Sequence, residues 1–319
     1  MSDRKKILFI VNPIAGIGKY VSVVASVEEL LDKKKFEHNI VFTKAPKHAT
    51  ELASQAAENN YDIVVAVGGD GTMHEVGKGL IGSSTALAII PRGSGNGMAR
   101  NLRIPVRIQR NLKVLNDCKT IKIDTVNINE DKFLGIAGVG FDALVAWEFS
   151  KFGKRGLPSY VKITLREFSN YISQNYELNI DGVSFCRNAF MISFANSAQF
   201  GGNAVIAPAA KIFDGKIDVS ILDKFPINAL PNMAYKLFTN SIDKSKYLEI
   251  IRGEKIFVKQ PFDYVHLDGE PFLMGKELHI KVNPLSLNIV VPDFSKPRKF
   301  GEGWAMQKWK TLAKEFQNI

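Results

Sequence analysis

The sequence predicts an α/β domain with a doubly wound parallel sheet, followed by an antiparallel β-sandwich domain. Over residues 5–122, apolar strand segments alternate with helical segments of about 10–15 residues, which is typical of a parallel sheet. After Asp124 the chain consists mainly of short alternating runs, separated by turn signals such as Asp181-Gly182, which are typical of antiparallel sheets. A chain of 319 residues is also longer than a domain with a single hydrophobic core usually is, so we expect two domains, at 1–122 and 123–292.

In the first domain, each expected strand is followed by a loop and then a helix. The strands are expected at residues 5–11, 38–43, 63–67 and 86–90, with helices up to about 33, over 46–58, from 72 onward, and within about 94–116. Pro46 suits the first turn of its helix, because the N–H that proline lacks has no partner there.

The second domain is expected to contain seven strands and two helical insertions. The strands are expected at residues 176–180, 190–194, 217–222, 255–258, 264–267, 278–282 and 287–291, and the helices at about 158–174 and 226–240. The segment 303–316 places Ala305, Trp309, Leu312 and Phe316 on one helical side. Such a stripe more often packs on its own domain than on a membrane, so we expect it to dock on the protein.

Composition limits the class of protein. No apolar run approaches the roughly 20 residues of a membrane span, and the apolar run at residues 7–11 is too short for a signal peptide. Cys118 and Cys186 offer neither a disulfide framework nor metal-ligand spacing, which indicates a reducing cytoplasm. The net charge of +10 suits a nucleic acid, an anionic membrane surface or a phosphorylated substrate. Because the basic residues are scattered and no nucleic-acid motif is present, no nucleic-acid partner is expected.

The stretch from Ile63 to Leu80, IVVAVGGDGTMHEVGKGL, carries the strongest site signal in the first domain. A buried strand is followed by three glycines that bracket Asp70, and Thr72 with Glu75 is interpreted as a capping box that opens a helix. Glycines let a ligand approach the backbone, so this strand, turn and helix predict a phosphate-binding edge. An ordinary βα turn is the alternative. An acid held at the carboxyl end of a strand favours the ligand site.

Two further loops follow strands of the same predicted sheet. NPIAGIGK, at residues 12–19, is neither a Walker loop nor a dinucleotide fingerprint, and it is interpreted as a βα turn or as a backbone cradle for phosphate or adenine. PRGSGNG, at residues 91–97, would present backbone N–H groups and small donors to a phosphate. Taken alone, this segment is an ordinary loop. Because it follows a strand of the same sheet as Asp70, we expect it to line the same site from a second side.

Three motifs in the second domain allow both a structural and a functional interpretation. GVGFD, ending at Asp142, is interpreted from its residues as a glycine-rich strand or bulge. LDGE, ending at Glu270, carries a strong hairpin signal, and KIFDGK, around Asp214, carries an Asp-Gly turn.

Taken in order, NPxxGxG, GGDGTxxE, PxGSGN and LDGE resemble the diacylglycerol kinase catalytic family, which includes bacterial lipid kinases and eukaryotic sphingosine and ceramide kinases. NAD kinases and phosphofructokinases carry a motif similar to GGDGT but are not expected to share LDGE. The resemblance spans nearly the whole chain. It implies a first domain like that of NAD kinases and phosphofructokinases, to which the C-terminal residues 293–319 return. Gly97 and His74 depart from the family pattern, which usually has Asp and Asn at these positions.

The resemblance also implies ATP and Mg²⁺ as cofactors and assigns roles to residues. Glu270 would be the general base, and Asp70 would act in catalysis by holding Mg²⁺ directly or through water. Asp214, with the backbone carbonyls of Lys211 and Lys216, would hold a structural magnesium, and Asp124 would organise a magnesium and water network. The nucleotide-binding residues implied are Asn12, Pro13, Ile14, Ala15, Gly16, Thr43, Gly68, Gly69, Asp70, Gly71, Thr72, Met73, His74, Glu75, Gly93, Ser94 and Asn96.

These residues predict an ATP-dependent lipid kinase that converts diacylglycerol to phosphatidic acid. The enzyme is expected in the cytoplasm, at the membrane periphery, where its lipid substrate lies. A sphingosine- or ceramide-type kinase is an alternative, because the GSGN form of the third motif is common in those enzymes. A soluble-substrate kinase such as an NAD kinase, or a non-catalytic nucleotide- or lipid-binding regulator, also stays open, as does the oligomeric state, with a homodimer among the states considered.

Overall fold

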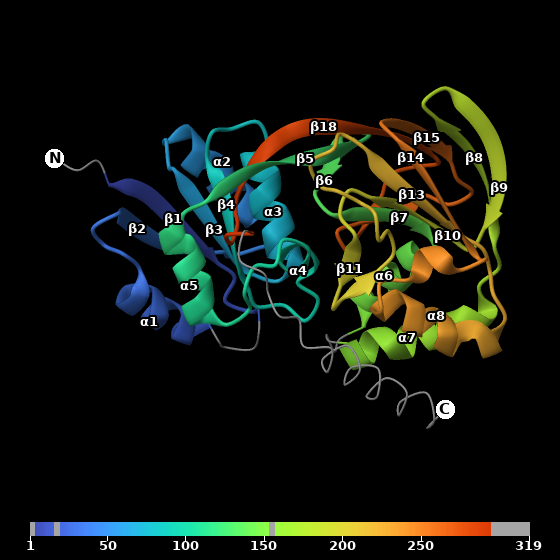
Figure 1. The fold of residues 1–319 in the computed structure, drawn as a ribbon, viewed down its shortest axis with the longest axis horizontal. Coiled ribbons are helices and arrows are strands. Elements are labelled where there is room, and N and C mark those ends of the chain that lie inside the picture. The colour runs from blue at the N-terminus through green and yellow to red at the C-terminus, as the bar shows by residue number, and fades with distance from the viewer. Residues whose placement is uncertain (1–3, 16–19, 153–156, 295–319) are drawn as a thin grey trace.

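A parallel α/β layer and an antiparallel β-sandwich lie side by side in the structure, as the sequence predicted (Figure 1). It is a computed structural model and describes residues 4–15, 20–152 and 157–294. Among these residues, one ten-stranded sheet runs through both layers. Its strands along the main path are β2 (Phe36–Phe42), β1 (Lys5–Val11), β3 (Ile63–Gly68), β4 (Ala86–Pro91), β18 (Glu277–Val290), β15 (Lys255–Lys259), β8 (Gln174–Ile180) and β9 (Val183–Ala189). Off this path, β5 (Thr120–Ile128) pairs with β18, and β6 (Asp131–Phe133) pairs with β5.

The first four strands of this path form the parallel part, since each pairs in parallel with its neighbours. The strands β1, β3 and β4 are mainly buried apolar runs that helices cover on both faces, whereas the edge strand β2 is partly exposed. The helices α2 and α3 pack on one face, whose core includes Ala53 and Val76, and α1 and α5 pack on the other, whose core includes Val27 and Leu112. This is the doubly wound arrangement that the sequence predicted. The helices of this part are α1 (Tyr20–Leu30), α2 (His48–Glu58), α3 (Asp70–Leu80), α4 (Gly97–Asn101) and α5 (Ile108–Asp117).

The strand β18 joins the two layers. The prediction of separate strands at 278–282 and 287–291 is wrong, because one strand runs continuously over Glu277–Val290. Its first half pairs with β15, and near its end Asn288 and Ile289 pair with β4. Pro284 has no N–H to donate, but it lies within a register shift against β5, between Asn283 and Leu287, where the ladder needs no such bond.

The predicted domain boundary at 122/123 falls inside β5. That strand pairs with β18 on both sides of the boundary, from Thr120 to Ile128. The two layers are therefore connected by an antiparallel ribbon of two strands, and the division at 122/123 stays a prediction.

A second, six-stranded sheet completes the sandwich, and its neighbouring strands are all antiparallel. A core that includes Tyr176, Phe194 and Val258 fills the space between the two sheets. In path order the strands are β14 (Leu248–Gly253), β13 (Ile217–Leu222), β10 (Met191–Ala195), β7 (Ile136–Gly140), β16 (Tyr264–Leu267) and β17 (Glu270–Leu273).

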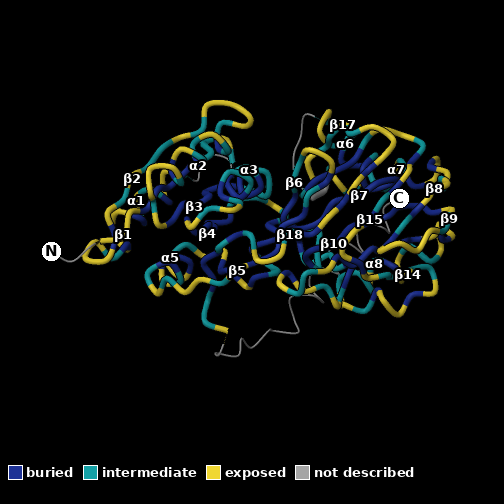
Figure 2. Tube along the Cα trace, turned by 90° about the horizontal axis from the view of Figure 1, so that it is seen from above, coloured by how far each residue is buried: buried dark blue, intermediate teal, exposed yellow. Residues whose placement is uncertain are grey.

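Three helices cover the outer face of this second sheet, with an aromatic core beneath them that includes Phe141, Phe168 and Phe190. Figure 2 shows the buried strands of both layers in dark blue, with exposed residues mainly on loops and helix surfaces. The remaining elements are α6 (Phe141–Lys151), α7 (Leu157–Asn170), α8 (Leu230–Phe238), the short hairpin of β11 (Gln199–Gly201) and β12 (Ala204–Val205), and the 3₁₀ turns η1 (Ile227–Ala229) and η2 (Ile242–Lys244).

The predicted return of residues 293–319 and the helical stripe at 303–316 lie outside the described residues from 295 onward. Up to that point, Val291 N donates to Lys119 O at 2.9 Å, and Asp293 forms an ion pair with Lys119 at 2.9 Å. Among the helices that the structure describes, none combines the length and the apolar character needed to cross a bilayer.

Candidate active site

Three loops meet at one edge of the parallel sheet, where β1, β3 and β4 end. Val11 is the register neighbour of Val67, and Val67 is the neighbour of Ile90. The predicted nucleotide loops that follow these strands therefore start side by side, at the edge where open α/β sheets bind ligands.

Asp70 is the first residue of α3, and its carboxylate is fixed by the loop after β4. Asn96 N donates to Asp70 Oδ2 and Gly97 N donates to Asp70 Oδ1, both at 2.7 Å. Burial raises the pKa of Asp70 above its ordinary value, although these two hydrogen bonds act in the opposite direction. The carboxylate is thus held in one orientation, in a site with limited solvent.

Glycines keep this edge narrow and free of side chains. A Cβ on Gly93 would lie 2.7 Å from Gly69 Cα, and a Cβ on Gly68 would lie 2.3 Å from Thr72 Oγ1. A Cβ on Gly95 would lie 2.8 Å from Asp70 Oδ2. Larger residues at these positions would push the loops apart or cover the carboxylate.

The first loop is tied to α3 through Asn12. Its amide Nδ2 donates to Thr72 Oγ1 at 3.1 Å, and its Oδ1 accepts the N–H of Ile14 at 3.1 Å. Pro13 and Ala15 lie in the same turn, whereas Gly16 lies outside the described residues.

The other predicted nucleotide residues differ in how far they can reach a ligand. Ile14 is 83% exposed and Ser94 is exposed, so both side chains are open to solvent. Thr43 follows β2, and its N–H donates to Val11 O at 2.9 Å, which places it beside the first loop. Met73 instead packs into the core beneath α3, so only its backbone can face a ligand.

The capping box predicted for Thr72 and Glu75 is wrong. The helix α3 begins two residues earlier, at Asp70, with Gly69 as its N-cap. The Glu75 carboxylate instead accepts the N–H groups of Lys47 at 3.0 Å and Ala49 at 3.2 Å, at the start of α2. Glu75 therefore caps the neighbouring helix, and its carboxylate is engaged there.

Arg92 is a residue that sequence reasoning missed. Its N–H continues the β3–β4 ladder by donating to Gly68 O at 2.7 Å, so it stands directly beside Gly69. Its side-chain atoms Nε and Nη2 are buried and have no hydrogen-bond partner among the described residues. Burial lowers the pKa of Arg92. A basic residue in a loop carries no pattern that would have singled it out.

Glu270 reaches this edge from the second domain. Asp268 and Gly269 both have positive φ, 50° and 89°, which is the geometry of a two-residue hairpin turn, and they connect β16 to β17. Glu270 Oε1 lies 2.8 Å from the point where a Cβ would stand on Gly71, the residue after Asp70. The two predicted catalytic carboxylates are therefore brought to the same turn of α3.

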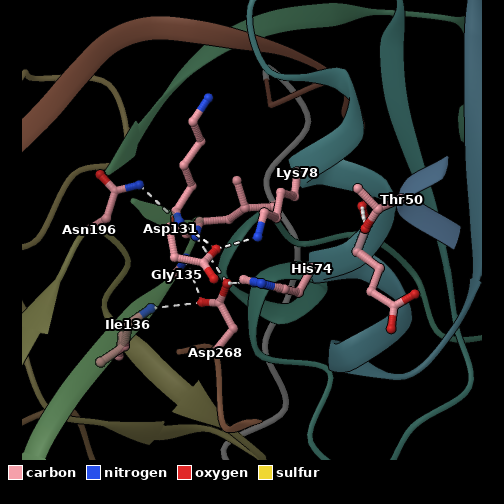
Figure 3. Close-up of polar contacts among 11 residues, drawn as sticks. Thr50, His74, Lys78, Asp131, Gly135, Ile136, Asn196 and Asp268 are labelled. Carbon is pink, nitrogen blue, oxygen red and sulfur yellow. Dashed lines mark hydrogen bonds and ion pairs between the residues drawn. The ribbon is translucent and has the colours of Figure 1, made fainter. Parts of the chain in front are cut away.

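Asp268 anchors this hairpin (Figure 3). Its Oδ1 accepts the N–H groups of Gly135 at 2.7 Å and Ile136 at 3.0 Å, and its Oδ2 accepts the N–H of Leu134 at 3.0 Å. Its Oδ2 also lies 2.7 Å from Nδ1 of His74, one turn after Asp70 on α3. Hydrogen bonds and charge from His74 hold the pKa of Asp268 below its ordinary value despite burial.

Two further contacts connect the same parts of the molecule. Lys78, on α3, forms an ion pair with Asp131 of β6 (Figure 3). The short β11–β12 hairpin packs on the PRGSGNG loop, where Gly202 N donates to Gly95 O at 2.9 Å. Two segments of the second domain thus flank the sheet edge.

The predicted structural magnesium at Asp214 does not fit the arrangement of its neighbours. Asp214 Oδ2 pairs with the guanidinium of Arg252, which also donates from Nε to Asp218 Oδ1 at 2.6 Å. A positively charged side chain therefore already pairs with the carboxylate that a cation would bind, so no step is assigned to such an ion. Metal ligation by Asp214 and by the carbonyls of Lys211 and Lys216 stays a prediction.

Asp124 is fully buried, and its side chain binds backbone N–H groups rather than facing solvent. Its carboxylate accepts the N–H of Gly215 at 2.7 Å and the N–H of Leu285 at 2.8 Å. It thereby ties the Asp-Gly turn at 214–215 to the irregular part of β18, while its role in a water network stays a prediction.

A buried polar cluster beside β7 adds a second group of residues that sequence reasoning did not assemble. Asp142 Oδ2 lies 3.1 Å from His266 Nε2 and accepts the hydroxyl of Ser193 at 3.2 Å. A Cβ on Gly138 would lie 2.1 Å from Asp142 Oδ2, so the glycine is required for this approach. The GVGFD segment drew attention to Asp142 in the sequence, but it did not indicate that His266 and Ser193 contact it.

Comparison with known proteins gives consistent matches over both parts of the chain. The family described as "Diacylglycerol kinase catalytic domain" matches residues 6–128, and the "YegS C-terminal NAD kinase beta sandwich-like domain" matches residues 135–291. A Pseudomonas putida protein named "Probable lipid kinase YegS-like" is 28% identical over 258 residues, which are 76% of this chain and 82% of that protein. A Staphylococcus saprophyticus protein named "Diacylglycerol kinase" is 27% identical over 280 residues, 84% of this chain and 89% of that protein.

The fold also matches solved structures. A Bacillus anthracis chain titled "The crystal structure of a diacylglycerol kinases" aligns with a TM-score of 0.71 at 21% identity, over 92% of this chain and 98% of that chain. Another chain from that organism aligns with a TM-score of 0.76 at 23% identity, over 92% and 99%. At this identity the likeness confirms the predicted fold class.

Proposed function

This chain belongs to the diacylglycerol kinase catalytic domain family, and on that basis we propose that it is an ATP-dependent lipid kinase. The γ-phosphate of ATP is transferred to a lipid hydroxyl, with diacylglycerol as the preferred acceptor and phosphatidic acid as the product. The relatives named as lipid and diacylglycerol kinases support a lipid acceptor.

The observation that carries this proposal is the approach of Glu270 to the turn that holds Asp70. Glu270 Oε1 stands 2.8 Å from the Cβ position of Gly71. A carboxylate from the second domain thus lies at the phosphate-binding edge of the first. A reaction between a nucleotide on one domain and a hydroxyl held by the other needs this arrangement.

The sheet edge suits a nucleotide triphosphate. The N-terminal N–H groups of α3 have no side-chain cap and favour an anion, and the glycines at 69, 71, 93 and 95 keep side chains out of this edge. The unpartnered guanidinium atoms of Arg92 would gain charged acceptors from a phosphate. In this proposal, Arg92 therefore binds the phosphates together with the Asn12 loop and the turn of Gly69.

The donor set at Asp70 fits Mg²⁺. A carboxylate has about four lone-pair sites, and the hydrogen bonds from Asn96 and Gly97 use one on each oxygen. The remaining lone-pair sites suit an ion that keeps several of its waters. When bound there, Mg²⁺ would neutralise charge on the transferring phosphoryl group.

Glu270 would accept the proton of the lipid hydroxyl while the hydroxyl oxygen attacks the γ-phosphorus. A bond forms between that oxygen and phosphorus, the bond to the β–γ bridging oxygen breaks, and ADP leaves with the electron pair. Glu270 is exposed, so the proton that it accepts can pass to solvent.

Transfer of ³²P from γ-labelled ATP to a panel of lipids in mixed micelles tests the proposal. The panel should contain diacylglycerol, sphingosine and ceramide, with NAD in detergent-free buffer as a soluble acceptor. We expect labelled phosphatidic acid. If sphingosine or ceramide is labelled instead, the protein is still a lipid kinase but diacylglycerol is not its preferred acceptor. Labelled NAD, or no transfer by a protein that binds ATP, would overturn the proposal.

A further inference from the structure

We propose that His74 is a positioning residue for phosphoryl transfer, which ties the hairpin of Glu270 to the helix of Asp70 through Asp268. This inference rests on the proposed function.

The location of His74 is the first argument. It lies one turn after Asp70 on α3, and Asp268 lies two residues before Glu270 in the β16–β17 hairpin. The 2.7 Å contact between His74 Nδ1 and Asp268 Oδ2 therefore connects the two elements that carry the proposed catalytic carboxylates (Figure 3).

The second argument is that the other partners of Asp268 cannot provide this connection. Leu134, Gly135 and Ile136 belong to the second domain, as the hairpin does, so their N–H groups fix Asp268 within that domain. Among the described partners of the Asp268 carboxylate, only His74 comes from α3. Without it, Glu270 keeps its place relative to its own sheet but is less well fixed relative to Asp70.

The third argument is charge. The side chains of His74 and Asp268 are only 6% and 4% exposed. Burial opposes the imidazolium, but the hydrogen bond and charge of Asp268, with a further contribution from Asp131, raise the pKa of His74 above its ordinary value, against the opposing charge of Lys78. The ring of Phe272, from the other strand of the hairpin, lies 6.4 Å away. A charged, hydrogen-bonded pair that is shielded from water holds its geometry more firmly than a neutral contact would.

Two substitutions separate the hydrogen bond from the charge. In His74→Leu both are lost. In His74→Asn the amide nitrogen stands one bond beyond Cγ, as Nδ1 does in histidine, so the donor is kept without the charge. Lys78→Met is the matched control, because it removes the Lys78–Asp131 ion pair one turn further along the same helix and leaves the hairpin contact in place.

Steady-state kinetics on the lipid acceptor give the first test. We expect kcat to fall about 10- to 100-fold in His74→Leu with little change in the KM for ATP, because a displacement of about 1 Å in a reacting group costs that much. His74→Asn should recover most of the loss at neutral pH. The wild-type kcat should decline as pH rises through the raised pKa of His74, and this decline should be absent in His74→Asn.

Hydrogen exchange gives a second test that needs no activity. The backbone N–H groups of Asp268, Gly269 and Glu270 should exchange faster in His74→Leu than in wild type, and at the wild-type rate in Lys78→Met. Wild-type kcat in His74→Leu, an equal loss in Lys78→Met, or unchanged exchange in the turn would overturn the inference. If the wild-type protein transfers no phosphate to lipid, the proposed function fails. The exchange result still shows whether the His74–Asp268 contact connects the helix to the hairpin.

Discussion

Arg92 brings a positive charge to the edge of the sheet without a hydrogen-bond partner for Nε or Nη2 among the described residues. Burying such a group costs free energy unless an acceptor is supplied. Asp70, the nearest predicted catalytic acid along this edge, already accepts N–H groups from Asn96 and Gly97. A bound phosphate would therefore provide the missing acceptor.

We predict that Arg92→Leu weakens ATP binding by about 10- to 100-fold, because a hydrogen bond to a charged group contributes roughly 1.5–3 kcal/mol. The melting temperature without nucleotide should not fall, since the substitution removes a buried and unpaired charge. Isothermal titration with ATP and with adenosine measures the effect. Unchanged ATP affinity, or an equal loss for adenosine, would argue against a phosphate contact.

The His74–Asp268 pair predicts a pH dependence of stability. The pKa of His74 is raised in the folded protein from its ordinary 6.5, so its contribution is complete below about 6.5 and is lost as pH rises through the folded pKa. The pKa of Asp268 is lowered from 3.8, so its contribution is present above that value and is lost only in acid.

The free energy of unfolding of the wild type should therefore exceed that of His74→Asn most clearly below the ordinary pKa of histidine, 6.5, and approach it as pH rises through the raised pKa of His74. Denaturant titrations of both proteins across this range measure the difference, because most other titrating groups are shared and cancel. A difference that is independent of pH would show that the imidazole carries no charge in the folded protein.

Short motifs singled out Asp70 and Glu270 as candidate catalytic residues, but not the partners that position them. The GGDGT and LDGE patterns are local, and glycines beside an acid signal a backbone turn that presents the acid. The contact between His74 and Asp268 joins residues separated by 194 positions, and no pattern in one sequence indicates that pairing. Arg92 was missed for the same reason, since its importance depends on what surrounds it.

At the scale of elements, the loop at 211–216 is held by an arginine. Arg252, on β14, bridges Asp214 in the loop and Asp218 on β13, whose side chain is 1% exposed. The positive charge that balances these two carboxylates thus comes from the protein itself.

We predict that a chelator leaves the melting temperature of the nucleotide-free wild type unchanged, because Arg252 already balances the two acids. Arg252→Ala should lower stability by about 1–3 kcal/mol, since buried Asp218 loses its partner, and should make the melting temperature rise with added Mg²⁺. Thermal unfolding with and without the chelator measures both effects. A chelator-induced drop in the wild type would instead support a resident structural cation.

Helices and strands were predicted well where the neighbouring residues in the sequence determine them. They were missed where contacts with a distant part of the chain determine them. The strands β1 and β13 were predicted with the bounds observed, because each is a short apolar run between turns. The capping box failed because Glu75 serves α2, whose N-terminus lies beside α3. The two halves of β18 were predicted as separate strands, and only the pairing with β5 shows that the strand continues past Pro284.

For the whole molecule, the fold class followed from the alternation of strands and helices and from the later change to short strands with Asp-Gly turns. The connection between the layers could not be derived in this way. It depends on the β5–β18 ribbon and on the His74–Asp268 contact, both of which join distant parts of the chain. The candidate site lies where these connections bring the second domain against the end of the parallel sheet.

The most direct test of this account is the rate of lipid phosphorylation by Glu270→Gln, measured beside its affinity for ATP. Glu270 is exposed, so the variant should fold and bind ATP as the wild type does. Because glutamine cannot accept the hydroxyl proton, we predict that kcat falls by about 10²- to 10⁴-fold. Phosphorylation at the wild-type rate would contradict the claim that a carboxylate from the second domain completes the site at Asp70.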